Sequence, residues 1–291
     1  MRGRTLYACA LALLVNCGPP DRNPGGTTGD DDGMDPDGAN ADDNCAKGTE
    51  MIYTIDQFNQ RLSQFDPMSK TFIDLGSINC PTNGSATPFS MSVDRAANAW
   101  VLYTNGEMFW VAINSGNLAC TKVQWNSPSG LKVFGMGFST DQPGGSSEAL
   151  YVGGGATQVQ STYTLAHVDP INLNTMPIGN QPALPEMTGN GNAELWGFMP
   201  EASNARIVQF DKTNGSIIKE FSQPMLAGTM SGYAFAHWGG DYWVFLQKGG
   251  ETSTKVYQID GVGGGIKTIT PTTGRTIVGA GVSTCAPVVI L

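Results

Sequence analysis

The sequence has few charged residues and almost no histidine. Charged residues make up 14% of the 291 residues, and the two histidines are His167 and His237. There is no Gly-x-Ser-x-Gly nucleophile turn, no His-Glu-x-x-His zinc motif and no phosphate-binding loop. No cysteine pair has the close spacing of a structural zinc site. These absences argue against the common hydrolases, metalloproteases and nucleotide-binding enzymes, and the sequence predicts no metal and no cofactor.

Basic residues are scarce as well. Lys and Arg total 16 against 25 Asp and Glu, for a net charge of −9. Residues 1–16 carry +2, residues 17–44 carry −7 and residues 45–291 carry −4, and the basic residues of this last part are scattered. Binding of nucleic acid needs a clustered basic patch. We therefore expect no nucleic-acid partner.

The N-terminus has the features of an export signal. Arg2 and Arg4 precede the apolar run Leu6–Val15, which is too short to span a bilayer as a mature helix. Asn16 and Cys17 complete a stretch that resembles the lipobox of bacterial lipoproteins, in which the Cys is acylated, although Asn16 departs from the usual small residue. The alternative is an ordinary signal peptide with an incidental Cys. We predict a lipoprotein signal peptide at 1–16 and lipidation of Cys17.

Residues 17–44 read as a tether. They contain eight aspartates among Gly and Pro and almost no apolar residues, so they cannot offset the entropy of ordering. A calcium loop centred on Gly33 would need acids at Thr28 and Ala39, and both are absent. Gly18 lacks the Asp that retains enteric lipoproteins at the inner membrane. We predict an exported protein that is lipid-anchored to the outer membrane or cell surface through a disordered acidic tether.

Residues 45–291 contain a repeat of about 45–51 residues. Each unit has four short strand-like runs separated by turns, which is the signature of propeller blades. An aromatic recurs in the second run and fills the wedge between sheets. An Asp or Asn recurs at the end of the third run and caps a turn, so these positions are structural. The aromatics are Tyr53, Trp100, Tyr151, Trp196 and Trp243, and the caps are Asp66, Asn114, Asp169, Asp211 and Asp260.

The first run of each unit alternates small and larger residues, as the crowded inner strands of a propeller require. These runs lie at 90–93, 135–138, 186–189, 234–237 and 279–282, and Glu186 is the one carboxylate among them. The C-terminus supplies a lone first strand at 276–285. The N-terminus supplies the other three strands, at 51–55, 61–66 and 71–78. Joined, they complete an all-β, five-bladed β-propeller of four-stranded antiparallel sheets. A ring closed in this way has no free sheet edge. We expect a monomer.

Four cysteines remain after export and lipidation. An oxidising compartment makes disulfides the default, and four cysteines allow three pairings. In the ring, Cys285 ends the first strand of the closing blade and Cys45 precedes its second strand. We therefore pair Cys45 with Cys285. Cys80 and Cys120 lie at the outer strands of adjacent blades and form the second predicted pair.

Several residues are candidates for a site at the rim. His237, Trp238 and Asp241 surround a Gly-Gly turn, where His237 could act as a base oriented by Asp241. The alternative is a plain hairpin whose Trp packs on the next blade. Further candidate ligand-binding residues are Glu186, Asn190 and Asp94 near the axis and Trp125 at the rim. The acids near the axis do not form the paired carboxylates of a glycosidase.

Two functions fit these features. The first is a surface-anchored propeller that binds an unknown protein or glycan through rim loops rich in Gly, Asn and aromatic residues. The second is a hydrolase or lactonase-type propeller enzyme with a site at the axial rim. Because no motif supplies a catalytic set, we assign no catalytic residue and favour the binding function.

The combination of segments 89–95, 134–139, 234–241 and 278–287 resembles a family of uncharacterised secreted β-propeller lipoproteins of myxobacteria and related bacteria. The resemblance covers about residues 45–287. It implies the propeller fold and an exported location, and that family also has Cys at the positions of Cys80, Cys120 and Cys285. It implies no activity.

Overall fold

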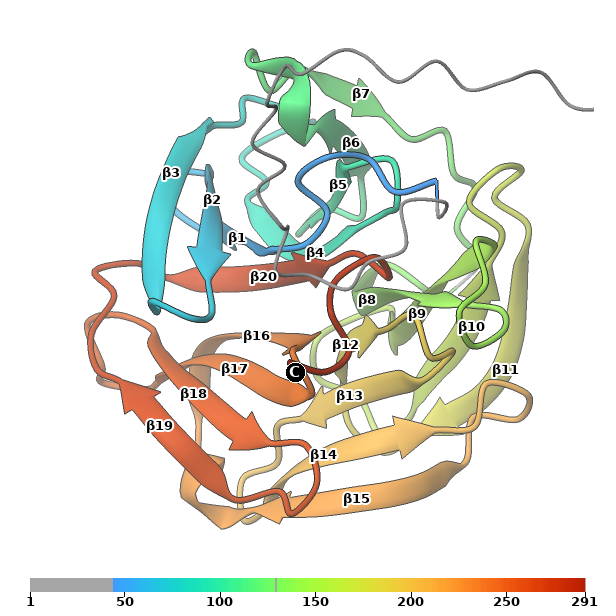
Figure 1. The fold of residues 1–291 in the computed structure, drawn as a ribbon. Coiled ribbons are helices and arrows are strands. Elements are labelled where there is room, and N and C mark those ends of the chain that lie inside the picture. The colour runs from blue at the N-terminus through green and yellow to red at the C-terminus, as the bar shows by residue number, and fades with distance from the viewer. Residues whose placement is uncertain (1–43, 129, 291) are drawn as a thin grey trace, which may run out of the picture. The chain divides into compact units, whose positions relative to one another are not determined.

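The computed structural model describes residues 44–128 and 130–290. They form five four-stranded antiparallel sheets in a ring around a central axis, which confirms the predicted five-bladed propeller (Figure 1). These residues contain no α-helix, and none of their helices is long and apolar enough to cross a membrane. The predicted signal peptide, the lipidated Cys17 and most of the tether lie outside the described residues.

Each blade is a meander, and we number the blades in ring order. Blade 1 combines β20 (Ile277–Val282) with β1 (Ile52–Asp56), β2 (Arg61–Asp66) and β3 (Thr71–Ser77). Blade 2 contains β4 (Pro88–Val93), β5 (Asn98–Tyr103), β6 (Met108–Ala112) and β7 (Cys120–Lys122). Blade 3 contains β8 (Val133–Thr140), β9 (Glu148–Gly155), β10 (Tyr163–Val168) and β11 (Thr175–Gln181). Blade 4 contains β12 (Glu186–Gly189), β13 (Leu195–Met199), β14 (Ala205–Phe210) and β15 (Ile217–Gln223). Blade 5 contains β16 (Met230–Trp238), β17 (Asp241–Lys248), β18 (Lys255–Asp260) and β19 (Ile266–Thr270).

The inner strands require small residues because their backbones nearly touch. A Cβ on Gly135 would lie 2.2 Å from the carbonyl oxygen of Pro185, and one on Gly281 would lie 2.7 Å from the backbone of Ser92. Larger residues alternate with these glycines and fill the wedges between blades. Each of the five core clusters contains at least one larger residue from an inner strand, for example Met91, Met136, Met187, Phe235 and Val282.

The five recurrent aromatics occupy these same wedges. Each is buried, and each belongs to a different core cluster, so the predicted role as wedge fillers is confirmed. In blade 1, Phe65 meets Trp243 of blade 5 edge to face, with ring centroids 5.5 Å apart. Such contacts add to the burial of apolar area and hold neighbouring sheets at a fixed angle.

Four of the five predicted turn caps are confirmed. The carboxylates of Asp66, Asp169, Asp211 and Asp260 accept backbone N–H bonds from residues two or three positions on. The prediction was wrong for Asn114. There β6 ends at Ala112 and a 3₁₀ helix, η1 (Ile113–Ser115), follows, so the Asn114 amide instead donates to the Lys47 carbonyl, 2.5 Å away.

The two ends of the described chain meet in blade 1. Strand β20 pairs with β1 antiparallel, with Ile52 opposite Val282. The disulfide Cys45–Cys285 lies beside this joint, with a Cα–Cα distance of 6.0 Å. The second disulfide, Cys80–Cys120, links blades 1 and 2, with a Cα–Cα distance of 5.2 Å. Both predicted pairings and the closure by strands from both ends are confirmed.

Candidate functional site

The inner strands of the blades surround the axis and all point the same way along it. Gly135 and Gly137 of β8 lie against Glu186 and Thr188 of β12 in the same order along both strands. The turns after the first and third strands of each blade therefore gather at one end of the ring. We call this end the exit rim, because the inner strands finish there. Loops at such an end of a rigid scaffold are the usual place for binding residues.

A largely buried polar network lies at the exit rim, and no sequence pattern predicts it. The Arg95 guanidinium donates to the Thr284 hydroxyl at 3.1 Å and approaches the Cys45 sulfur at 3.4 Å. The Thr284 hydroxyl donates to the Glu148 carboxylate at 2.7 Å, and the Arg95 backbone N–H donates to the other carboxylate oxygen at 2.9 Å. The network ties blades 1, 2 and 3 together beside the disulfide.

Glu148 has a perturbed acidity. Burial raises its pKa to about 7, opposed by the hydrogen bonds from Thr284 and Arg95. A carboxyl group with a pKa near 7 can serve as a general acid. Here both carboxylate oxygens already accept internal hydrogen bonds, which is the arrangement of a structural link between blades.

His237 is buried on β16 and does not pair with Asp241. Burial lowers the pKa of His237 to about 4, with Glu194 and Asp241 opposing the shift. Its ring lies 5.5 Å from that of Tyr242, and its Nδ1 atom has no hydrogen-bond partner within the described residues. The imidazole is therefore neutral near pH 7, and the predicted base–acid pair is not formed.

Asp241 is held by other side chains. Its carboxylate accepts from Gln258 at 2.7 Å and forms an ion pair with Lys267 at 2.7 Å. The Trp238 indole donates to the Glu50 carbonyl at 2.5 Å, so Trp238 packs across the joint between blades 5 and 1. Both residues border a hollow of about 240 Å³. The described residues that line it are Pro67, Met68, Lys70, Trp238, Gly239, Asp241, Trp243, Gln258 and Ile290.

Glu186 lies away from the exit rim, at the start of β12. Its carboxylate accepts a hydrogen bond from Ser90 at 2.6 Å, although β12 and β4 are not neighbours in the ring. The bond therefore crosses the axis. Burial raises the pKa of Glu186 well above its usual value, and the hydrogen bond from Ser90 opposes this shift.

Asp94 and Asn190 cap turns. The Asp94 carboxylate accepts from the backbone of Asn98 at 2.8 Å and from the Trp100 indole at 2.8 Å. The Asn190 side chain accepts from the Asn192 backbone at 3.0 Å and donates to Glu194 at 2.8 Å. The structure thus spreads the sequence-predicted candidates over separate places. Within the described ranges, no three His, Cys, Asp or Glu side chains converge on a point that could hold a metal ion.

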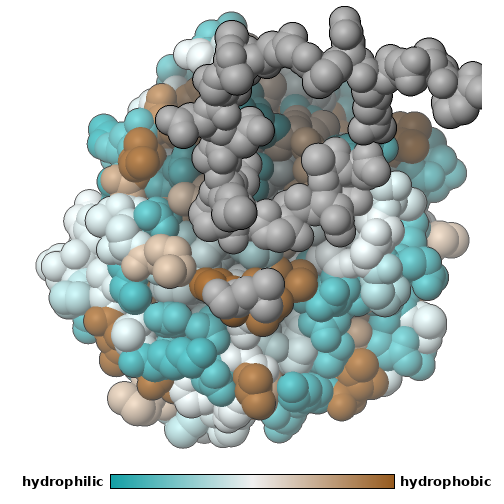
Figure 2. All heavy atoms as spheres, viewed as in Figure 1, coloured by the Kyte–Doolittle hydropathy of each residue, from teal (hydrophilic) through white to brown (hydrophobic). Residues whose placement is uncertain are grey.

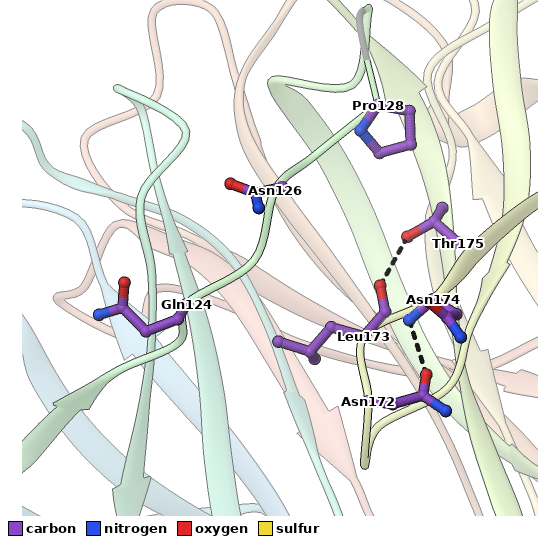
Figure 3. A pocket seen from close by; sticks show the side chains of 7 residues that line it. All are labelled: Gln124, Asn126, Pro128, Asn172, Leu173, Asn174 and Thr175. Carbon is purple, nitrogen blue, oxygen red and sulfur yellow. Dashed lines mark hydrogen bonds between the residues drawn. The ribbon is translucent and has the colours of Figure 1, made fainter.

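A second hollow, of about 280 Å³, lies between blades 2 and 3; we call it the amide groove (Figure 3). One wall is the segment that follows β7, and the other is the turn between β10 and β11. Figure 3 shows the Leu173 side chain extending from this turn toward the opposite segment. The described residues that line it are Gln124, Asn126, Pro128, Asn172, Leu173, Asn174 and Thr175.

Trp125 fixes the two walls relative to each other. Its indole N–H donates to the Thr175 hydroxyl at 2.9 Å, and its ring meets Phe134 edge to face. The Trp125 ring is half-buried beside the groove and is not part of its lining. Of the candidates taken from the sequence, Trp125 is thus the one that supports this groove.

Apolar residues on the described surface are dispersed. In Figure 2, the hydrophobic residues of the visible face lie in separate small groups among hydrophilic ones. Single exposed apolar residues are normal for a soluble surface, whereas large continuous patches mark protein interfaces. The two hollows are therefore more specific features of the described surface than any of these apolar groups.

No family model matches the sequence, and no curated protein matches it. Similar solved structures include a protein of unknown function from Bacteroides caccae, with 10% identity, coverage of 79% of this chain and 97% of that chain, and a TM-score of 0.45. A chain of a nidogen/laminin complex has 10% identity, coverage of 79% and 97%, and a TM-score of 0.49. A luciferin-regenerating enzyme has 12% identity, coverage of 81% and 76%, and a TM-score of 0.49. Because the identities and scores are this low, no function is transferred from these proteins.

Proposed function

We propose that this protein is a lipid-anchored lipoprotein of the outer membrane or cell surface whose propeller binds a protein or glycan. The anchor would be Cys17, followed by the acidic tether to residue 44. Two disulfides favour an oxidising, exported location. The resemblance of four segments to secreted propeller lipoproteins of myxobacteria supports the same assignment.

One observation supports binding over catalysis. The acids and histidine that could catalyse a reaction are engaged in internal hydrogen bonds or buried, as in Glu148, Asp241 and His237. The side-chain amides of Gln124, Asn126 and Asn174, by contrast, are exposed and make no hydrogen bond to other described residues. Uncommitted polar groups around a hollow are available for a ligand.

The anchor is tested by labelling cells with an alkyne fatty acid and fractionating them. The full-length protein should incorporate label and follow the outer membrane, and Cys17→Ala should do neither. Protease treatment of intact cells should remove the propeller if it faces outward. Unlabelled wild-type protein, or membrane association of Cys17→Ala equal to that of wild type, would contradict the anchor.

Binding is tested separately with the full-length protein in detergent micelles. It should retain a surface polysaccharide or a purified surface protein without altering it. Release of a hydrolysis product during retention would favour the hydrolase or lactonase alternative. Retention of neither kind of material would contradict the proposed function.

A further inference from the structure

Four blades share one turn between their third and fourth strands. In each, the backbone N–H four residues after the Asp donates to the carbonyl of that Asp, at 2.7–2.8 Å. The residue that donates always takes a left-handed conformation. These residues are Lys70 (φ 56°), Leu173 (φ 62°), Gly215 (φ 73°) and Gly264 (φ 72°).

Leu173 is poorly suited to this position. A side chain in the left-handed region is strained, and glycine or asparagine adopts it more readily. Blades 4 and 5 use glycine in the same turn, so the turn itself does not require leucine. Strain of this kind is concentrated at functional positions. In this turn the strained side chain lines the amide groove.

The groups around Leu173 are polar but uncharged. Asn172 and Thr175 are held by internal hydrogen bonds, whereas the amides of Gln124, Asn126 and Asn174 are uncommitted among the described residues. An amide offers donors and an acceptor together, which suits a hydroxyl group. Among the described residues, no Asp, Glu, Lys or Arg lines the groove. The lining therefore suits a neutral ligand rich in hydroxyl groups.

We infer that the amide groove binds one ring of a neutral saccharide; this deepens the proposed binding function and rests on it. The C–H face of the ring packs against Leu173 and Pro128, and its hydroxyls bond to the amides around the rim. The volume of about 280 Å³ lies at the small end of ligand pockets, roughly 300–1,000 Å³. One ring fits this volume better than a whole oligosaccharide does.

The walls are in place before the ligand arrives. The Trp125–Thr175 hydrogen bond joins them, and the Asp169 carboxylate accepts from the Ile171 backbone at 2.8 Å within the turn. A preformed site loses less conformational entropy on binding. Leu173 also packs on the core cluster of blades 2 and 3, so a change there has to be judged against stability as well as binding.

The test uses the full-length protein in detergent micelles and immobilised oligosaccharides. Neutral hexose oligosaccharides are compared with uronic-acid oligosaccharides of the same length, and with extended peptides. Leu173→Asn keeps a residue that accepts the left-handed turn but removes the apolar contact. Ile171→Asn is the matched control, because it replaces an apolar side chain by the same amide in the same turn, at a residue that is 93% exposed and is not among the lining residues of the groove. Asn174→Ala removes one exposed amide and should not disturb folding.

We expect neutral oligosaccharides to bind, with affinity reduced at least tenfold by Leu173→Asn, at least threefold by Asn174→Ala and unchanged by Ile171→Asn. If Leu173→Asn does not fold, Asn174→Ala decides the question. Preference for uronic acids or peptides, or equal binding by wild type and Asn174→Ala, would overturn the inference. Retention of a surface protein without any saccharide would overturn it and leave the proposed function standing, whereas retention of neither would overturn both.

Discussion

Blade 5 and blade 1 have the same sheet, but only blade 5 is continuous in sequence. In blade 5, a two-residue turn joins β16 to β17, with Trp238 opposite Asp241. In blade 1, the corresponding strands β20 and β1 come from opposite ends of the domain. The disulfide Cys45–Cys285 stands where the hairpin of blade 5 has its turn. A covalent sulfur link thus takes the place of chain continuity at the one joint of the ring that lacks it.

The largest expected effect comes from removing that link. The two disulfides span 240 and 40 residues, and loop entropy then predicts stabilisation of about 5.5 and about 4 kcal/mol. We expect Cys45→Ser with Cys285→Ser to lower the free energy of unfolding more than Cys80→Ser with Cys120→Ser. Urea unfolding of the full-length proteins in oxidising buffer measures this. In reductant, wild type and both double variants should have the same free energy of unfolding. A smaller loss without Cys45–Cys285 than without Cys80–Cys120 would contradict this prediction.

Arg95 is the second test of the joint. Arg95→Met removes the guanidinium that donates to the Thr284 hydroxyl and whose charge acts to lower the pKa of Glu148, and leaving such a buried polar group without its partner costs about 1–3 kcal/mol. Burial holds the pKa of Glu148 at about 7, above its usual 4.5. The protonated Glu148 carboxyl is the form that favours folding, so its contribution to stability is greatest below the pKa that Glu148 has in the unfolded chain. This contribution is lost as the pH rises through 7.

The loss caused by Arg95→Met should accordingly be larger at pH 8 than at pH 5. Urea unfolding at both pH values measures it. Arg61→Met is the matched control, because the Arg61–Asp74 ion pair at 2.8 Å is exposed and such pairs contribute less than about 1 kcal/mol. Equal losses for the two variants at pH 8 would show that the network at the exit rim is not part of the closure.

Much of this fold can be read from the sequence because blades are local. The strand runs, the five aromatics and four of the turn caps lie within single repeats, and the position of the half blades implies the closure. Asn114 was misjudged, since a 3₁₀ turn and an Asx turn begin with similar residues. The Arg95 network was missed because its partners are 53 and 189 residues away in sequence.

The candidate site could be predicted only in part. Trp125 was identified as a rim residue, but its contact with Thr175 depends on how blades 2 and 3 pack. Leu173 did have a signal in the sequence. Aligning the turns on Asp66, Asp169, Asp211 and Asp260 places two glycines opposite Lys70 and Leu173, which marks these two turns as different. His237 and Asp241 are close in sequence, yet they form no pair. Asp241 lies opposite Trp238, whereas His237 lies opposite Tyr242, and successive positions along paired strands point to opposite faces.

The smallest effect is expected at Glu186, far from the joint. Its pKa is raised well above the usual value, so the protonated form is the one that favours folding, and stability falls as the pH rises through the folded-state pKa. Glu186→Gln keeps the shape and cannot ionise. Its melting temperature should exceed that of wild type at pH 9 by about 2–4 °C, the shift produced by roughly 1 kcal/mol in a domain of this size. The two melting temperatures should agree at pH 4. A Glu186→Gln variant that is less stable than wild type at pH 9 would contradict the raised pKa of Glu186.

Hydrogen exchange of the backbone amides in β20 and β1 tests the closure most directly. If the two strands are halves of one sheet, the amides of Ile52, Thr54, Ala280 and Val282 should share one protection factor. They should lose protection together when Cys45 and Cys285 are both replaced by Ser, before the inner strand of blade 5 does. Protection of β1 that persists after β20 has exchanged would show that the ends fold separately and would contradict the account.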